Sequence, residues 1–564
     1  MSSQDLISRV PDVTLDTQET VERADSASHH PTNPPGDHWR FAKGLSPIWH
    51  DRLIEVGLIL SMALYYVIGN GHLGKGYLFQ LNPLFSIPFL LIFAALCWYR
   101  LSFALALLPL TLPFYLQQKT VISHYSFSLA EITLAVCLVV ALLQLLLQRK
   151  SWNYSQLWRD LRDRLGPFSI PILIFFLAAA FSIVIAYSRV VALRAFREEV
   201  WNPLLYLLLA LIYLRSRQDV TRLLVALLGT GFVVALLGLA QYFLFRNLLV
   251  LEPDGIRRVH AMYGSANGIG LLYDYVLPIG LALVVAKTQQ TLGILASWRA
   301  RVLASALCVP LLCVLYLSQS RGAWFAIAVA MLFIATLSIR NRKVLIVSGL
   351  IFVIIMSVVV FVFHTRIADF IIGGHTSVKG VSTVTRRLSL WQSALNMLHD
   401  SPWFGYGMDN WLCHYSANLV CHTPQLFHYW NSKNIFTGAP LVGLRDEPTL
   451  SHPHNIFLQV WVSMGLFGLL AFLVIIGLFF WLFVRILVHL RSSKFAGSPY
   501  LHWMTVGVGA AMLAALVHGL FDSSFLEQDL AFCFWMLITA LLLLRSLSGT
   551  PWRGWLKQEQ EHIT

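Results

Sequence analysis

Long apolar stretches alternate with short polar connections along most of this 564-residue chain. A helix needs about 20 predominantly apolar residues to cross the hydrocarbon core of a bilayer. We therefore predict a membrane-spanning helix at each stretch that approaches this length. The predicted spans are 53–69, 82–98, 101–116, 128–148, 169–187, 201–214, 221–245, 268–286, 303–318, 322–339, 344–363, 456–487, 501–519 and 528–544.

This pattern predicts an all-α polytopic membrane protein with about 12–14 transmembrane helices. The segments 82–98 and 101–116 are the least clearly separated, since Arg100 is the charge between them. The expected regions are a disordered cytoplasmic tail at 1–48, transmembrane helices 1–11 at 49–363, one large extracytoplasmic loop at 364–455, the C-terminal transmembrane helices at 456–546 and a cytoplasmic tail at 547–564.

Composition and charge agree with lipid as the solvent. Only 12% of the residues are charged and 57% are hydrophobic, whereas a soluble domain carries about 25% charged residues. The net charge of +13 does not indicate a nucleic-acid partner, because Lys and Arg punctuate the apolar runs and form no single patch. The polar segment 1–48 has no apolar core of a cleavable signal peptide.

Basic clusters orient the predicted helices. Cytoplasmic connections of membrane proteins carry an excess of Lys and Arg. Alternating spans place both tails in the cytoplasm and put most of the 41 Lys and Arg residues on that side. The inner clusters lie at 149–164, 215–222, 287–301, 340–343 and 485–494.

Four connections on the predicted outer side also carry arginine. A guanidinium is always charged and presents a planar fork of donors that suits phosphate oxygens. Several of them together would bind a di-anionic or poly-anionic headgroup, although each could instead hold a lipid phosphate or snorkel to the interface. The tight connection at Arg321 leaves little freedom to snorkel. The four segments are LRAFREEVWNPLLYLLL with Arg194 and Arg197, GIRRVHAMYGSANG with Arg257 and Arg258, SQSRGAW with Arg321, and TRRLSLWQSALNMLHDSPWFGYGMDNW with Arg387.

Two histidines precede the long apolar helix near 456. In LSHPHNIFLQVWVSMGLFGLL, Asn455 is a candidate N-cap, which places His452 and His454 just outside the membrane. A neutral histidine can take a proton from a hydroxyl near neutral pH. The alternative is an interfacial histidine bonded to the backbone.

We expect neither a cofactor nor a metal. His-Pro-His lacks a third ligand at helical spacing, and the sequence contains no HExxH, GxGxxG or Walker motif. Cys413, His414, Cys421 and His422 could hold zinc. We favour a disulfide between Cys413 and Cys421, because the outer side of a bacterial membrane is oxidising.

Several motifs resemble the O-antigen ligase and O-antigen polymerase superfamily. These are SRGAW at 320–324, RRLSLWQSALNMLHDSPWFGYG at 386–407 and HPHNIFLQVWVSMGLFGLL at 452–470, with support from RVHAMYGSANG at 258–268, LRAFREEVWNPLL at 193–205 and HGLFDSSFLEQDLAFCFW at 518–535.

The resemblance implies a metal-independent, inverting membrane glycosyltransferase of the C type in the bacterial inner membrane, with its site facing outside. Such enzymes move a glycan from a polyprenyl (undecaprenyl) pyrophosphate to an acceptor hydroxyl on a glycan, lipid or protein. The family's essential arginines match Arg258 and Arg321, and its essential histidine matches His454. Weaker candidates for the pyrophosphate site are Arg194, Arg197, Arg257 and Arg387, and His452 and Asn455 would support the site.

Two other functions remain open from the sequence. One is a transporter, since some relatives carry a bicarbonate-transporter label, and the other is a lipid-binding scaffold. A transporter should place ionisable residues near the bilayer midplane. The clearest intramembrane carboxylate, Asp274, lies only about two helical turns from the predicted outer end. The charges gather at one face, which favours surface chemistry over translocation.

Overall fold

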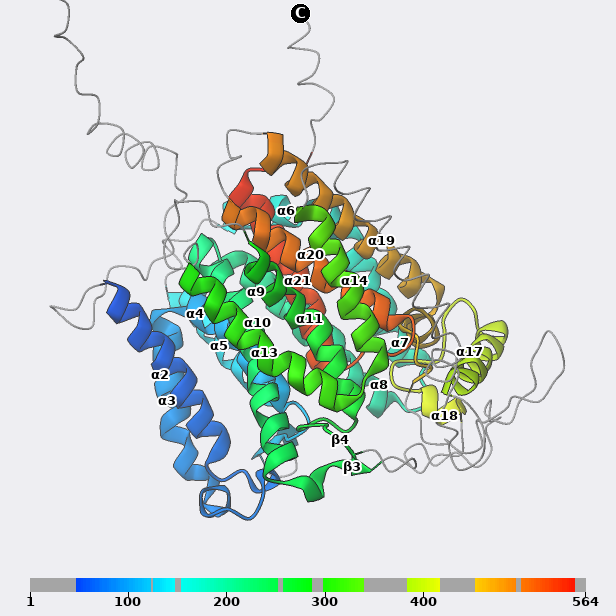
Figure 1. Cartoon of the computed structure of the whole chain (residues 1–564), viewed down its shortest axis with the longest axis horizontal. Helices are drawn as coiled ribbons and strands as arrows, with labels where there is room; N and C mark the ends of the chain where they lie inside the picture. Colours follow the sequence, from blue (N-terminus) through cyan, green and yellow to red (C-terminus); the bar gives the residue numbers. More distant parts are fainter. Residues whose placement is uncertain are drawn as a thin grey trace, which may run out of the picture.

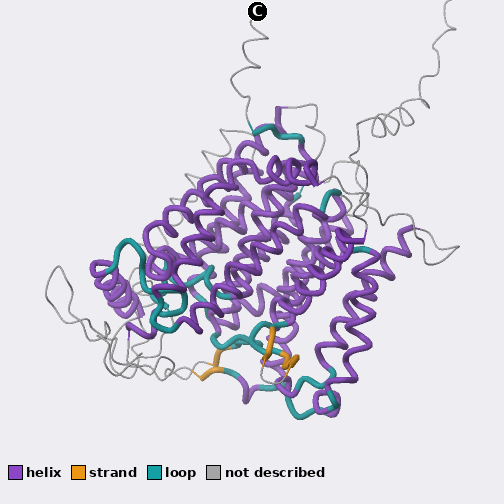
Figure 2. Tube along the Cα trace, turned by 180° about the vertical axis from the view of Figure 1, so that it is seen from behind, coloured by secondary structure: helices purple, strands orange, loops and turns teal. Residues whose placement is uncertain are grey.

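The computed structural model of the chain describes residues 47–122, 125–147, 154–251, 257–286, 298–338, 383–415, 452–492 and 499–552. Helices make up nearly all of this part (Figure 1, Figure 2). The α-helices are α2 (Pro47–Val67), α3 (Ile87–Tyr99), α4 (Leu101–Leu107), α5 (Leu129–Leu147), α6 (Tyr154–Leu165), α7 (Ser169–Ile185), α8 (Arg189–Ala195), α9 (Asn202–Tyr213), α10 (Arg217–Phe243), α11 (Ala266–Val285), α13 (Trp298–Ser318), α14 (Arg321–Ser338), α17 (Thr383–Asp400), α18 (Trp411–Tyr415), α19 (Ile456–Ser492), α20 (Pro499–Gly519) and α21 (Gln528–Ser548).

Short elements join these helices. Two antiparallel hairpins contain the strands, and in the second hairpin Val250 pairs with Arg258. The π-helix η7 (Phe196–Trp201) connects α8 to α9. The remaining elements are the 3₁₀ helices η1 (Gly71–Leu73), η2 (Tyr77–Gln80), η3 (Pro83–Ser86), η4 (Leu108–Phe114), η6 (Gly166–Phe168) and η8 (Arg246–Leu248), and the strands β1 (Lys119–Ile122), β2 (Tyr125–Phe127), β3 (Val250–Leu251) and β4 (Arg257–Arg258).

The fold class predicted from the sequence is confirmed. Among the described residues, nine helices are long and apolar enough to cross a membrane, or up to ten if the pair Pro83–Tyr99 and Leu101–Phe114, bent by 115° at Arg100, forms one broken span. The nine are Leu129–Leu147, Tyr154–Ile185, Arg217–Phe243, Ala266–Val285, Arg301–Ser318, Arg321–Ser338, Ile456–Arg491, Tyr500–Gly519 and Gln528–Ser548.

Apart from 82–98 and 101–116, which form the bent pair, three predicted spans are not among these helices. The span at 53–69 corresponds to α2, which carries Asp51, Arg52 and Glu55 near its start. The span at 201–214 corresponds to α9, whose 12 residues continue η7. The span at 344–363 lies outside the described residues.

The bundle has a buried centre and a lipid-like periphery. α21 is the most enclosed helix, with 89% of its apolar window buried, and α11 and α20 pack beside it. α7 and α14 are only 28% buried over their windows. The exposed apolar side chains on such peripheral helices, Ile170 and Leu177 among them, suit contact with lipid tails. The rest of the protein does not cover these apolar side chains, so the lipid of the bilayer must separate them from water.

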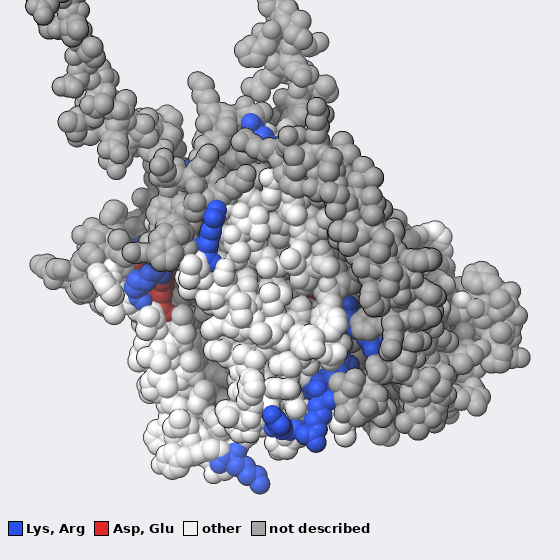
Figure 3. All heavy atoms as spheres, in the orientation of Figure 1, with Lys and Arg blue, Asp and Glu red and all other residues white. Residues whose placement is uncertain are grey.

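The two ends of the bundle differ. We call the site end the one at which α10 and α13 finish and α11, α14, α19 and α21 begin; the β3–β4 hairpin and α17 lie at this end (Figure 1). On the face drawn in Figure 3, one group of Lys and Arg lies at the lower end, near that hairpin, others lie higher up and at the left beside Asp and Glu, and most of the described surface between them is uncharged. This distribution is typical of a membrane-embedded bundle.

α19 is broken where a loop enters it. Gly465 has φ 71° and ψ −173°, which interrupts the helix. Leu466 donates its backbone N–H to the Trp403 carbonyl at 3.1 Å, and Tyr406 donates its own to the Val462 carbonyl at 2.7 Å. A side chain at Gly465 would lie about 2.1 Å from the Trp403 oxygen, so only glycine fits here. The break fixes the segment after α17 against α19.

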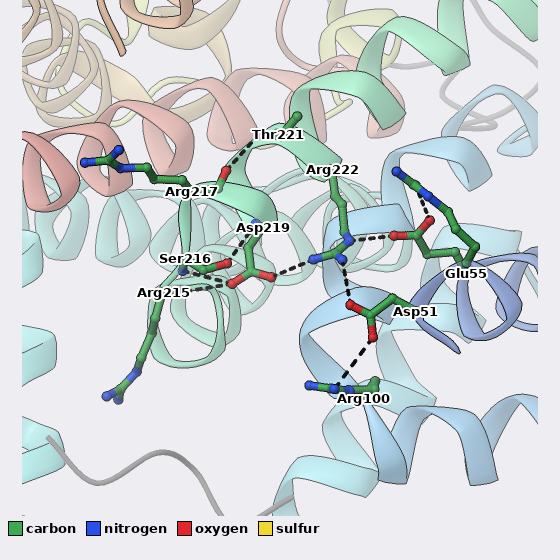
Figure 4. A network of polar contacts seen from close by, with 10 residues as sticks. Asp51, Glu55, Arg100, Arg215, Ser216, Arg217, Asp219, Thr221 and Arg222 are labelled. Carbon is green, nitrogen blue, oxygen red and sulfur yellow. Dashed lines mark hydrogen bonds and ion pairs between the residues drawn. The ribbon is translucent and has the colours of Figure 1, made fainter. Parts of the chain in front are cut away.

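At the opposite end, an ion-pair network attaches α2 to the rest of the bundle (Figure 4). Arg222 on α10 contacts Glu55 at 2.6 Å, Asp51 at 3.5 Å and Asp219 at 3.4 Å. Arg100 also contacts Asp51, at 3.6 Å. The network joins three segments that are far apart in the sequence.

Candidate functional site

Asp522 is the centre of the polar contacts at the site end. It lies in the connection between α20 and α21 and is 2% exposed. Its Oδ1 accepts hydrogen bonds from His454 Nδ1 at 2.6 Å and from the backbone N–H of Ser523 at 2.9 Å. Its Oδ2 accepts one from Asn267 Nδ2 at 3.1 Å and lies 3.6 Å from Arg387 Nη2. Four segments of the chain therefore meet at one carboxylate.

This environment determines the protonation of the pair. Burial alone would raise the pKa of Asp522, but the adjacent His454 and Arg387 hold it well below its usual range. Asp522 is therefore a carboxylate and accepts the Nδ1–H of His454. In a neutral His454 with this tautomer, Nε2 carries the free lone pair that can accept a proton from a hydroxyl.

Arg258 is joined to this pair through an amide. Its Nε donates to the Ser318 carbonyl at 2.8 Å, and its Nη2 donates to Asn267 Oδ1 at 2.8 Å. Asn267 thus accepts from Arg258 with its oxygen and donates to Asp522 with its nitrogen. The result is a continuous chain of contacts, Arg258–Asn267–Asp522–His454, which couples a guanidinium to a candidate base.

Arg321 begins α14 only three residues after Ser318, the residue that holds Arg258. Gln319, in the turn between them, has a positive φ of 54°. Trp324 fixes the turn, because its backbone N–H donates to the Ser320 carbonyl and its Nε1 donates to the Leu315 carbonyl, at 3.1 and 3.0 Å. The N-terminal end of α14 adds a partial positive charge beside the Arg321 guanidinium. Arg258 is therefore held by the turn from which Arg321 begins α14.

The weaker arginine candidates divide into two groups. Arg387 reaches Asp522 and joins the site. Arg194 and Arg197 both contact Glu198, at 3.1 and 2.7 Å, and Arg197 also contacts Glu131 at 2.9 Å. These carboxylates offset the positive charge of Arg194 and Arg197. The two arginines are therefore less suited to bind an anion than an arginine without a carboxylate partner.

The arginine next to Arg258 takes a different position. Arg257 is exposed on β4, whereas Arg258 beside it is half-buried. The strand alternation that turns neighbouring side chains to opposite faces explains the difference.

His452 and Asn455, which we predict to support the site, lie on either side of His454 in the sequence. The His452 ring lies 4.4 Å from the His454 ring in an edge-to-face arrangement, and burial lowers the pKa of His452 to about 3, so this ring is neutral. Asn455 Oδ1 accepts the N–H groups of Phe457 and Leu458, both at 3.0 Å. The predicted N-cap is thereby confirmed.

Within the described residues, one group has the composition and spacing of a metal site. The ligand-type atoms of His452, His454 and Asp522 all lie within 4.8 Å of one another. However, the carboxylate of Asp522 already accepts three hydrogen bonds and contacts Arg387, and a nearby guanidinium disfavours a cation. The geometry fits a hydrogen-bonded pair better than a metal centre, and metal independence stays a prediction.

The cysteine prediction is settled in part. Cys413 is disulfide-bonded, which removes the free thiolate that zinc would require. Its predicted partner Cys421 and the nearby His422 lie outside the described residues, so the pairing stays a prediction. His414 packs its ring 4.5 Å from that of Tyr406, and burial lowers its pKa to about 4.

Sequence reasoning missed two residues of the site, Asp522 and Asn267. Both lie inside motifs quoted for the family resemblance, HGLFDSSFLEQDLAFCFW and RVHAMYGSANG. No spacing rule links them, because they are 255 positions apart. The sequence shows only that Asp522 and Asn267 are polar residues near helix ends. This signal does not indicate that the two residues contact each other.

The fold and the site together define a multi-pass membrane protein with an arginine-rich, His–Asp-containing site at one end of its bundle. Residues 306–473 match the family model described as O-antigen ligase. This segment includes Arg321, Arg387 and His454, and it confirms the resemblance to the O-antigen ligase and polymerase superfamily. No curated protein matches the chain.

Proposed function

We propose that this protein is a glycosyltransferase that moves a glycan from a polyprenyl (undecaprenyl) pyrophosphate to an acceptor hydroxyl, as an O-antigen ligase or polymerase does. The observation that carries the proposal is the chain Arg258–Asn267–Asp522–His454. It brings a cation suited to phosphate and a histidine suited to a hydroxyl into one hydrogen-bonded unit. The donor lipid tail would lie in the surrounding membrane.

Arg258 and Arg321 would bind the pyrophosphate of the donor. The bond that breaks joins the anomeric carbon of the glycan to a pyrophosphate oxygen, which departs with the electron pair. Guanidinium groups that are already in place stabilise the negative charge that develops there. Arg258 is held by Ser318 and Asn267 before any ligand binds, so little reorganisation is needed.

His454 would activate the acceptor. As the acceptor oxygen bonds to the anomeric carbon, its proton passes to Nε2 of His454, and the ionised Asp522 stabilises the imidazolium that forms. A single displacement of this kind inverts the anomeric configuration. The bond changes and the charges balance without a metal or a cofactor.

We place the site end on the outside of the bacterial inner membrane. The support is the positive-inside rule, since basic side chains such as Arg159, Arg162 and Arg215 lie at the opposite end of the bundle. The transporter alternative gains nothing from Asp274, which is fully buried and lies 2.5 Å from His518. Such a pair joins α11 to α20 and lines no described pore.

A transfer assay tests this proposal. Purified protein in nanodiscs receives an undecaprenyl-pyrophosphate glycan, and the product is followed by gel or mass spectrometry. We expect Arg258→Ala, Arg321→Ala and His454→Ala each to lower kcat/KM by about 100-fold or more. Arg246→Ala, which changes an exposed arginine at the same end, is the matched control and should keep near-normal transfer.

The same assay tests the finer assignments. Transfer should persist in EDTA, and activity that disappears with EDTA and returns with a divalent ion would contradict metal independence. Chain growth without a second acceptor would indicate a polymerase, whereas transfer that needs a distinct acceptor would indicate a ligase. If the three alanine variants transfer as well as the wild type, the proposed catalytic roles are wrong.

A further inference from the structure

A second histidine–aspartate pair lies beside the site, and the proposed mechanism does not use it. His518 is near the end of α20, and its Nδ1 lies 2.5 Å from Oδ2 of Asp274 on α11. Both side chains are buried, at 1% and 0% exposure. The backbone carbonyl of His518 also accepts the N–H of Asp522 at 3.0 Å. The pair therefore lies one turn before the carboxylate that contacts His454.

Stability alone does not account for the pair. A buried carboxylate is costly unless donors match its oxygens. Oδ1 of Asp274 has no hydrogen-bond partner among the described residues. Apolar residues of similar volume in place of a buried charged pair are often neutral or stabilising. The contacts that the pair makes with neighbouring elements are therefore the better guide to its role.

The His518 ring packs against the first turn of α14. A methyl group added at Gly322 would lie 2.5 Å from Nε2 and 2.6 Å from Cδ2 of His518. A side chain at this position would collide with the ring, so glycine permits the close approach. Gly322 directly follows Arg321. The ring thus lies beside the backbone that carries this arginine.

α11 contacts the same turn through a second glycine. A methyl group added at Gly270 would lie 2.7 Å from Ser320 Oγ and 2.7 Å from the Cβ of Ala323. Ser320 directly precedes Arg321. The two sequence neighbours of Arg321 are therefore both held, one by α11 and the other by the His518 ring.

The pair closes a triangle of three helices. α11 contacts α14 at Gly270, α14 contacts α20 at Gly322, and the carboxylate of Asp274 joins α11 to α20. Gly270 and Asp274 are four positions apart and lie on one face of α11. Asn267, three positions before Gly270, shares this face and contacts Asp522. One face of α11 thus contacts both the turn at Arg321 and the carboxylate of the candidate base.

We propose that Asp274 and His518 are a positioning pair, which holds the turn at Arg321 against α11 and so places the Arg321 guanidinium relative to His454. This inference rests on the proposed function and adds two positioning residues to it. Both side chains are buried, so the pair acts through Arg321 and not by touching the donor. A displacement of about 1 Å at a binding group can cost on the order of 100-fold in rate, so a fixed turn matters here.

Hydrogen exchange tests the position of the turn without turnover. The full chain in nanodiscs is placed in heavy water, and peptides that contain residues 319–324 are analysed by mass spectrometry. The variants are Asp274→Leu, which keeps a similar volume and removes the charge, and His518→Asn, which removes the ring edge that faces Gly322. The matched control is His502→Asn, at a half-buried histidine near the start of α20.

The wild-type turn should be protected, because the Gln319 N–H donates to the Tyr316 carbonyl and the Trp324 N–H donates to the Ser320 carbonyl, both at 3.1 Å. We expect these amides to exchange about tenfold faster in both variants and at the wild-type rate in the control. Peptides of α21, the most enclosed helix, should keep their exchange rates, which shows that the variants are folded. Unchanged exchange at 319–324 in the folded variants would overturn the proposal.

Binding of undecaprenyl pyrophosphate tests whether the pair acts through Arg321. Each variant should raise the Kd by about tenfold or more when Arg321 is present, and by less than about twofold in an Arg321→Ala background. A general structural role would weaken binding equally in both backgrounds, and that result would overturn the proposal. If the wild type does not bind undecaprenyl pyrophosphate, the proposed function fails, whereas the exchange rates still decide whether the pair positions the turn.

Discussion

His454 holds a backbone conformation that L-residues seldom adopt, with φ of 52°. This region costs about 1 kcal/mol or more for a residue with a side chain. The short contact with Asp522 and the cap at Asn455 hold the residue there. Gln319, in the turn just before Arg321, has a positive φ as well, so a second strained position lies beside a proposed pyrophosphate ligand.

The first prediction concerns Asp522→Asn. The amide would present a donor to His454 and favour the tautomer with the proton on Nε2, which cannot act as a base. We expect kcat to fall by about 10²–10⁴-fold, as loss of the aspartate does in serine-protease triads. Steady-state transfer kinetics and undecaprenyl-pyrophosphate binding are the measurements.

The effect of Asp522→Asn on kcat, compared with its effect on donor binding, shows whether Asp522 acts through His454 or through the donor site. Binding of undecaprenyl pyrophosphate should stay close to that of the wild type, because Arg258 keeps its contact with Ser318. A kcat within about threefold of the wild type would show that His454 does not depend on this carboxylate.

At the scale of elements, breaks in helices position the site. α19 opens at Gly465 to accept the segment after α17. That segment continues to Asp409 and Asn410, and α17 itself carries Arg387. The apolar pattern of the sequence predicts an uninterrupted helix here, because hydropathy does not register a single residue with positive φ.

The second prediction concerns the attachment of α2. Arg222 contacts three carboxylates and lies 3.7 Å from the centre of the Phe103 ring, with 14% of its side chain exposed. Arg222→Ala would leave Glu55 and Asp219 buried without this partner, at a cost of about 3 kcal/mol. We expect a lower midpoint of thermal unfolding in detergent.

Arg217→Ala on the same helix is the control. Its side chain points away from the carboxylates of the network (Figure 4), so its midpoint should change little. Equal effects of the two substitutions would mean that the network does not stabilise the attachment of α2.

At the scale of the whole molecule, charge and hydropathy separate the two ends of the bundle. Arg258, Arg321, Arg387 and His454 gather at the site end, although the predicted outer side of a membrane protein is ordinarily poor in basic residues. The anion-binding role that we propose would account for this exception.

The third prediction is the orientation of the bundle. In a background without the exposed Cys313, single cysteines replace His399 on α17 or Ser155 on α6, both exposed. A membrane-impermeant maleimide should label His399→Cys in intact cells and Ser155→Cys only after permeabilisation. The reverse pattern would place the site in the cytoplasm and contradict the proposed donor.

The sequence determined the fold class and part of the site. Lipid excludes unpaired backbone and charged groups, so spans are visible as local apolar runs, and nine such helices occur in the described residues. The cap at Asn455 was also predictable, because a cap is a contact between residues two or three positions apart. The family motifs indicated Arg258, Arg321 and His454 as residues to examine.

Only the tertiary structure decided which polar groups meet. Asp522 and Asn267 join His454 to Arg258 although they come from different helix ends. Arg197, which looked like an anion ligand, is paired with Glu131 from α5. The physical reason is that local hydropathy reports whether a residue leaves water, whereas the partner of a buried charge depends on packing between segments hundreds of residues apart.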